Sequence, residues 1–88
     1  MLETVNIKDI DYFIFNDYTN DINSKTGEPI IILMNYNDNK SLILYNTLAE
    51  RFNSLMEKAV KGKEAYRLNI VKLKSKKILY ILKSIEPI

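Results

Sequence analysis

The chain contains no cysteine, histidine or tryptophan, and it has only two glycines and two prolines among 88 residues. Without cysteine, disulfide bonds and thiolate metal sites are excluded. Without histidine, the side chain that most often serves as a general base near neutral pH is missing. Gly27 and Gly62 lie too far apart to form a glycine-rich phosphate-binding loop. These absences argue against an enzyme.

Long hydrophobic runs are also missing. The longest, such as residues 30–34, is far too short to span a bilayer. Acidic residues appear early in the N-terminal segment, so we expect no signal peptide and a cytoplasmic protein that does not bind membranes. Hydrophobic residues make up 47% of the sequence, which is enough for a core. At this length, we expect residues 1–88 to form a single domain.

Residues 47–62 have the periodicity of an amphipathic helix. Their apolar residues form one stripe, and polar residues take the opposite face. Thr47 followed by Glu50 matches a capping box, and Gly62 suits the left-handed position that often follows a helix. The stripe consists of Leu48, Ala49, Phe52, Leu55, Met56, Ala59 and Val60. We expect this stripe to cover the core that the strands form.

Segments rich in β-branched and aromatic residues lie on both sides of this helix and predict strands. The predicted strands span residues 10–15, 29–36, 41–45, 65–74 and 77–85, with turns at 37–40 and 75–76. Turn-forming residues dominate positions 16–28 and predict a long loop. The apolar positions change phase near Ile70 and Val71, which predicts a β-bulge there.

The element order is therefore strand, strand, strand, helix, strand, strand. This is the order of the OB-fold, a small and partly open Greek-key barrel. We expect a mainly β domain with one helix, built as an OB-like five-stranded small barrel. An open antiparallel sheet with the helix packed on one face would bury the same residues, and the pattern does not separate the two.

Positive charge gathers near the C-terminus, where positions 67–83 contain six basic residues and no acidic one. Single-stranded nucleic acid is bound by cations that neutralise phosphates and by flat rings that stack on bases. The candidate cations are Arg67, Lys72, Lys74, Lys76, Lys77 and Lys83, and the candidate rings are Tyr36, Tyr45, Tyr66 and Tyr80. We predict that these residues bind single-stranded DNA or RNA without sequence preference. The simpler interpretation is that the lysines solvate exposed strands and the tyrosines are half-buried strand residues.

A family resemblance points the same way. The strand IDYFIF, the hairpin PIIILMNYNDNKSLILY, the helix and the basic hairpin YRLNIVKLKSKKILYIL together resemble small OB-fold single-strand nucleic-acid-binding proteins, including short ones made by bacteriophages and archaeal elements. The likeness covers nearly the whole chain and rests on topology. It implies that nucleic acid lies across the second and third strands, between loops 16–28 and 75–76. The first loop departs from the pattern because Asp17, Asp21 and Glu28 outnumber Lys25.

A protein-interaction module is the main alternative, for example a subunit or a phage-type inhibitor of a host factor. Such a module would expose an apolar patch or an unpaired sheet edge. Residues 10–15 and 77–85 are apolar on both faces of their strands. They are compatible with such a surface, and with a homodimer formed through an edge strand.

Four acidic residues could form a site for a hard cation. Asp9 and Asp11 share one face of an extended segment, and Asp17 and Asp21 could add oxygen ligands for an ion such as Mg²⁺. Ordinary acidic residues at a strand entry and in a loop are the simpler interpretation. We therefore expect no metal, no cofactor and no catalytic residue.

Overall fold

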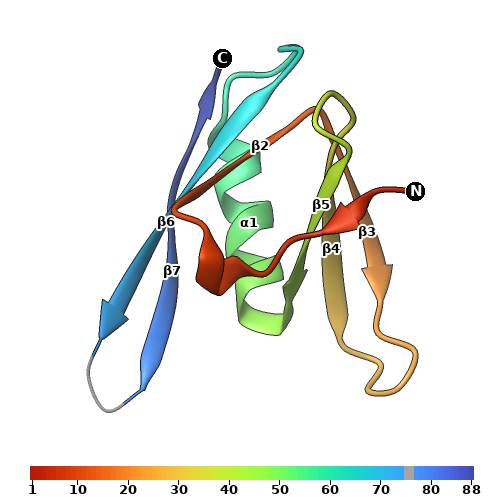
Figure 1. Cartoon of the computed structure of the whole chain (residues 1–88), viewed down its shortest axis with the longest axis vertical. Coiled ribbons are helices and arrows are strands. Elements are labelled where there is room, and N and C mark those ends of the chain that lie inside the picture. Colours follow the sequence, from red (N-terminus) through yellow and green to blue (C-terminus); the bar gives the residue numbers. More distant parts are fainter. Residues whose placement is uncertain (75–76) are drawn as a thin grey trace.

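The computed structural model describes residues 1–74 and 77–88, and over these residues the chain is mainly β-strand with one α-helix (Figure 1). The elements are β1 (Glu3–Thr4), the 3₁₀ turn η1 (Ile7–Asp9), β2 (Tyr12–Phe15), β3 (Asp17–Ile22), β4 (Pro29–Asn35), β5 (Lys40–Tyr45), α1 (Asn46–Lys58), β6 (Tyr66–Lys74) and β7 (Ile78–Pro87). The predicted turn at Ser75 and Lys76 lies outside the described residues.

The described strands form two sheets. Sheet A has the order β1-β5-β4-β3, and sheet B has the order β2-β6-β7. Only Asn16 separates β2 from β3, and these two strands pair antiparallel with β6 and β4 respectively. A single bent segment therefore runs from one sheet into the other. Across residues 1–74 and 77–88 the sheets do not close into a barrel, because β1 and β7 remain edge strands. The mainly β class with one helix is confirmed, and the open arrangement agrees with the alternative architecture.

The predicted loop at residues 16–28 is wrong in its first half. Asp17–Ile22 forms β3, which pairs with β4 from Asp17 opposite Met34 to Ile22 opposite Pro29. Its residues are mostly polar and exposed, so they show no buried period-two pattern. Backbone hydrogen bonds to β4 stabilise this strand, and no local sequence signal reports them. The turn shrinks to residues 23–28, where Gly27 has a φ of +75°.

The core lies between the two sheets and α1. The helix contacts β4 and β5 of sheet A and β7 of sheet B, and it lies behind the opening between the sheets in Figure 1. Phe52 is fully buried, and its ring meets Phe15 edge to face at 5.5 Å between centroids and Tyr18 at 5.0 Å. Burying a large apolar side chain of this kind contributes roughly 1.5–3 kcal/mol. The aromatic cluster thereby fixes the helix against both halves of the bent strand.

Both ends of the helix differ from the prediction. The helix begins at Asn46, whose φ is +49°, and Tyr45 is the N-cap without a side-chain hydrogen bond. Because β5 leads directly into the helix, Thr47 lies inside the first turn and the predicted capping box does not form. At the other end the backbone becomes extended at Ala59, so Val60 is exposed. Gly62 has a φ of +76° but lies in the following connection, beyond the helix.

Candidate interaction surface

The β6–β7 hairpin continues past the core. Ile70 and Leu82 are buried opposite each other, and beyond them the hairpin extends away from the rest of the domain as a two-stranded ribbon (Figure 1). Four cross-strand pairs follow in this part, from Val71 opposite Ile81 to Lys74 opposite Ile78. One face of this ribbon is exposed, whereas Lys72 on the opposite face contacts η1.

One face of this ribbon is aliphatic. Because side chains alternate along a strand, the buried Leu68 and Ile70 place Val71 and Leu73 on the outer face of sheet B. Their cross-strand partners are Ile81 and Leu79. The exposed fractions are 36% for Val71, 47% for Leu73, 47% for Leu79 and 43% for Ile81. We call these four residues the outer-face cluster.

The outer-face cluster explains the change of phase in the sequence. The register between β6 and β7 shifts between Asn69 and Ile70, with Lys83 as the additional residue of β7. An irregularity therefore lies within one residue of the predicted position, but the extra residue belongs to β7 and not to β6. Strand β6 keeps its alternation through the shift. The apolar residues after Ile70 consequently face solvent instead of the core.

The opposite face of the ribbon is basic and aromatic. Lys72 lies across from Tyr80, and Lys74 lies across from Ile78. Tyr80 is half-buried, whereas the side chain of Lys74 is exposed. Of the predicted nucleic-acid contacts, Lys72, Lys74 and Tyr80 are thus brought together on one face.

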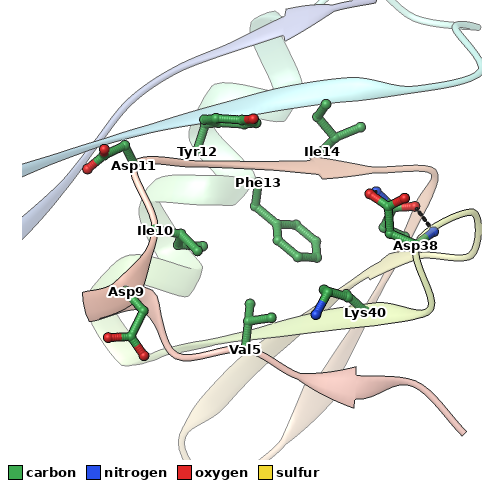
Figure 2. A pocket seen from close by; sticks show the side chains of 10 residues that line it. Val5, Asp9, Ile10, Asp11, Tyr12, Phe13, Ile14, Asp38 and Lys40 are labelled. Atoms are coloured by element: carbon green, nitrogen blue, oxygen red, sulfur yellow. Dashed lines mark hydrogen bonds between the residues drawn. The ribbon is translucent and has the colours of Figure 1, made fainter.

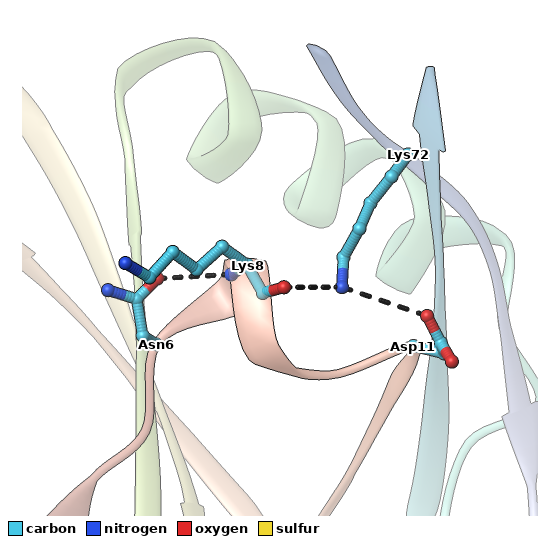
Figure 3. Close-up of polar contacts among 4 residues, drawn as sticks. All are labelled: Asn6, Lys8, Asp11 and Lys72. Carbon is cyan, nitrogen blue, oxygen red and sulfur yellow. Dashed lines mark hydrogen bonds and ion pairs between the residues drawn. The ribbon is translucent and has the colours of Figure 1, made fainter. Parts of the chain in front are cut away.

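Lys72 already has protein partners on this face. Its Nζ donates a hydrogen bond of 2.7 Å to the carbonyl oxygen of Lys8 and lies 3.7 Å from Oδ1 of Asp11 (Figure 3). Asn6 caps the same turn by accepting a hydrogen bond from the backbone N–H of Lys8. The Lys72 ammonium group therefore attaches η1 to β6 instead of standing free for a phosphate.

Arg67 lies on the outer face of β6, the face of Val71 and Leu73, and next to β2. Its guanidinium carbon lies 3.9 Å from the centroid of the Tyr12 ring, and its Nε donates to Oδ1 of Asn69 at 2.9 Å. Tyr12 is 45% exposed, so this cation–π pair is at the surface. Sequence reasoning did not select Tyr12. Only the pairing of Tyr12 with Asn69, on a distant strand, reveals that the ring lies beside Arg67.

Two other predicted rings lie on sheet A. Tyr36 follows β4 and Tyr45 ends β5, and both are about half exposed. The register of β4 with β5 places Tyr45 opposite Ile30, while Tyr36 follows the pair Asn35–Lys40. The two rings therefore lie at opposite ends of the β4–β5 hairpin. They do not form a continuous stacking platform.

Tyr66 must be removed from the predicted site. Its side chain is 7% exposed, and its ring stacks on Phe15 at 5.6 Å between centroids. Its hydroxyl donates to the carbonyl oxygen of Val60 at 2.7 Å and accepts from the N–H of Lys63 at 3.3 Å. A ring held in this way is part of the core and cannot stack on a base in the folded domain.

The remaining predicted cations lie apart from one another. Lys77 and Lys83 are exposed near opposite ends of the distal part of β7. Lys83 and Arg67 line an open pocket of about 420 Å³ together with Asp11 and Glu86. Carboxylates therefore accompany two of the predicted phosphate contacts. Lys76, the last of the predicted cations, lies outside the described residues.

A second pocket, of about 400 Å³, lies between the N-terminal segment and β2 (Figure 2). Val5, Ile10 and Phe13 supply apolar walls, and Asp9 and Lys40 stand at its border. Asp38 also lines the pocket and accepts a hydrogen bond from Asn35 at 3.3 Å. The lining combines apolar surface with charges of both signs.

The acidic residues considered for a cation are distributed over separate elements. Asp9 is in η1, Asp11 is paired with Lys72, and Asp17 and Asp21 are on β3. Over residues 1–74 and 77–88, no group of three or more histidine, cysteine or acidic side chains is placed to hold a metal ion.

The α-helix described is too short to cross a membrane. Comparison of the chain with protein-family models, with curated proteins and with solved structures gave no match.

Proposed function

We propose that this protein is a non-catalytic protein-interaction module that binds its partner through the outer-face cluster. The observation that carries the proposal is the pairing of Val71 with Ile81 and of Leu73 with Leu79 on one exposed face. Cross-strand pairing places these four aliphatic side chains next to one another. The ribbon that carries them extends from the domain (Figure 1).

The chemistry of these side chains favours a protein partner. Aliphatic groups carry no charge for a phosphate and no ring for a base, so they contribute little to nucleic-acid binding. Removing apolar surface from water contributes about 25 cal/mol per Å² to the free energy of binding, so a partner that covers this face is stabilised. Contiguous apolar patches on small proteins commonly mark interaction sites.

Single-stranded nucleic-acid binding is the second candidate. It is supported by the opposite face of the ribbon, where Lys72, Lys74 and Tyr80 lie together. An OB-like interpretation of the fold belongs to this candidate, because the bent segment β2–β3 contributes to both sheets. We rank it second because Lys72 is bound to Lys8 and Asp11, and because Tyr66 is buried.

The test compares the wild-type protein with the double variant Leu73→Thr/Leu79→Thr as bait in an extract of the cells that produce it. The matched control is Val60→Thr, which removes an exposed apolar side chain outside the cluster. Any captured protein is then purified and titrated against the three baits. We expect the wild type and the control to bind it equally, and the double variant to bind at least about tenfold more weakly, a difference of about 1.4 kcal/mol.

Equal affinity of the double variant would contradict the proposal. A titration with a single-stranded oligothymidylate at about 20 mM salt, where electrostatic attraction is strongest, addresses the second candidate. Binding of the oligonucleotide that requires Lys74 and Tyr80 but not the outer-face cluster would replace the first candidate with the second.

A further inference from the structure

The edge of β7 adds a second feature to the same surface. Strand β7 is the last strand of sheet B and pairs with β6 along one side. Within residues 1–74 and 77–88, no strand pairs with its other side. The backbone N–H and C=O groups on that side are available to another strand. The partner need not lie flat on the ribbon, because it can extend the sheet.

The free edge is limited to the distal part of β7. At Leu82 the carbonyl oxygen accepts a hydrogen bond of 3.3 Å from Nε of Arg51, a residue of α1. The bulge at Lys83 follows directly. Both features interrupt regular pairing from Leu82 onward. The segment that remains suitable for strand addition is Ile78 to Ile81, which is also the part that carries Leu79 and Ile81 of the outer-face cluster.

The charges around this edge select the partner. Lys77 precedes the free segment, Lys83 follows it, and Lys74 lies across from Ile78. These three lysine side chains are exposed, and the sequence has no acidic residue between positions 67 and 83. An added strand with carboxylates near its ends would be attracted to these ammonium groups.

A second copy of this chain fits the edge poorly. In a two-fold antiparallel pairing of Ile78 to Ile81 with the same segment of a second copy, Lys77 of one copy would lie opposite Leu82 and next to Lys83 of the other, and the same contact would occur twice. Like charges brought this close destabilise a strand pair. Lysines at sheet edges are a common device against self-association. The edge therefore favours a foreign strand over its own copy.

We infer that the partner contributes an extended acidic segment that pairs with Ile78 to Ile81 and continues sheet B. Its alternate side chains are apolar and lie beside Leu79 and Ile81, and carboxylates near its ends approach Lys77 and Lys83. This inference rests on the proposed function, because it specifies how the partner uses the outer-face cluster. Strand addition supplies affinity through backbone hydrogen bonds and specificity through alternate side chains.

The test is a titration of the ¹⁵N-labelled full chain with the synthetic peptide acetyl-Glu-Val-Thr-Val-Thr-Val-Glu-amide. Two control peptides accompany it: one in which every valine and threonine is N-methylated, which removes backbone donors from both edges of the strand, and one with lysine in place of both glutamates. We expect chemical-shift changes across Ile78 to Ile81 with the first peptide, and slowed hydrogen exchange at the alternate amides of this segment that point away from β6. The control peptides should bind at least about tenfold more weakly, because ladder hydrogen bonds or charge attraction are lost.

Charge variants of the protein test the same electrostatic attraction as the control peptides. Lys77→Glu/Lys83→Glu should weaken binding of the acidic peptide and strengthen binding of the lysine peptide. Lys25→Glu/Lys63→Glu changes the net charge equally but lies away from the segment Ile78 to Ile81, so it should do neither. Binding of the N-methylated peptide as tightly as the parent peptide overturns strand addition. Shifts confined to residues outside β6 and β7 overturn it as well, and so does an oligothymidylate that shifts these amides when the peptide does not.

The two proposals fail in different experiments. If the captured partner requires Leu73 and Leu79 but the amides of Ile78 to Ile81 stay unprotected in that complex, strand addition is wrong and the interaction surface stands. If capture does not depend on Leu73 and Leu79, the proposed function itself is wrong, whatever the peptide does.

Discussion

The ammonium group of Lys72 donates a hydrogen bond of 2.7 Å to the carbonyl oxygen of Lys8, which lies 64 positions earlier in the chain. The same group lies 3.7 Å from a carboxylate oxygen of Asp11. The side chain of Lys72 is 20% exposed and that of Asp11 is 89% exposed. The hydrogen bond is the shorter of the two contacts, and together they join the N-terminal turn to β6.

Replacing Lys72 with methionine keeps most of the aliphatic stem and removes the donor. We expect the free energy of unfolding to fall by about 0.5–1.5 kcal/mol, as is typical for the loss of one intramolecular hydrogen bond. Asp11→Asn should cost clearly less, because exposed ion pairs contribute little. Urea denaturation of the three proteins measures both effects. An Asp11→Asn variant that loses as much stability as Lys72→Met would show that the ion pair, and not the hydrogen bond, holds the turn.

Replacing Tyr66 with phenylalanine removes a hydroxyl that makes two part-buried hydrogen bonds, to the carbonyl of Val60 and from the N–H of Lys63. We expect a loss of about 0.5–1.5 kcal/mol in the free energy of unfolding, because these hydrogen bonds join the core ring to the connection after the helix. Tyr45→Phe, at a ring that is 51% exposed, is the control and should change stability by less than about 0.5 kcal/mol. Thermal or urea unfolding followed by circular dichroism gives both values. Equal stability of the two variants would show that the hydrogen bonds of the Tyr66 hydroxyl do not contribute to stability.

The outer-face cluster should be dispensable for folding. The double variant Leu73→Thr/Leu79→Thr exchanges two half-exposed side chains for residues with good strand propensity, so we expect a change within about 0.5 kcal/mol. The contrast is Leu68→Thr, at a fully buried position of the same strand, which should cost at least about 2 kcal/mol. Urea denaturation curves compare the two. Severe destabilisation by the double variant would mean that the cluster belongs to the core.

The ends of the helix give a further prediction. Gly62 has a φ of +76°, and a Cβ added there would meet no atom within 4 Å. Gly62→Ala should therefore cost about 1 kcal/mol through backbone conformation alone. Thr47→Ala should cost less than about 0.5 kcal/mol, because Thr47 makes no cap. If Thr47→Ala lowers the free energy of unfolding by about 1 kcal/mol, the usual value for a lost N-cap, the capping box that the sequence predicts is present after all.

Much of the fold could be predicted because its signals are local. Strands β4 and β5 are apolar runs joined by a turn of Asn and Asp residues, and α1 has a continuous apolar stripe. Strand β3 was missed for a physical reason: its hydrogen bonds to β4 are non-local, and its side chains are mostly polar and exposed. The start of the helix was also misplaced, because Asn46 takes a positive φ. Asparagine tolerates this conformation, but the sequence does not specify which asparagine adopts it.

The candidate site was harder to predict. Tyr66 and Tyr80 have the same kind of strand pattern, yet only Tyr66 finds hydrogen-bond partners in the connection after the helix. The apolar residues after Ile70 predicted a bulge in this strand, although β6 continues its alternation and turns them outward. Whether an apolar strand face is covered depends on how far the neighbouring elements reach. That is a property of the assembled domain and not of the local sequence.

The central claim is that the outer-face cluster is uncovered in the free protein. Solvent paramagnetic relaxation enhancement, measured at methyl groups with a neutral gadolinium chelate, tests it without knowledge of the partner. We expect the methyls of Leu73, Leu79 and Ile81 to show enhancements similar to those of Ile22, which is 64% exposed, and far above those of Leu33, which is fully buried. Enhancements as small as those of Leu33 would mean that the face is already covered, and would contradict the account.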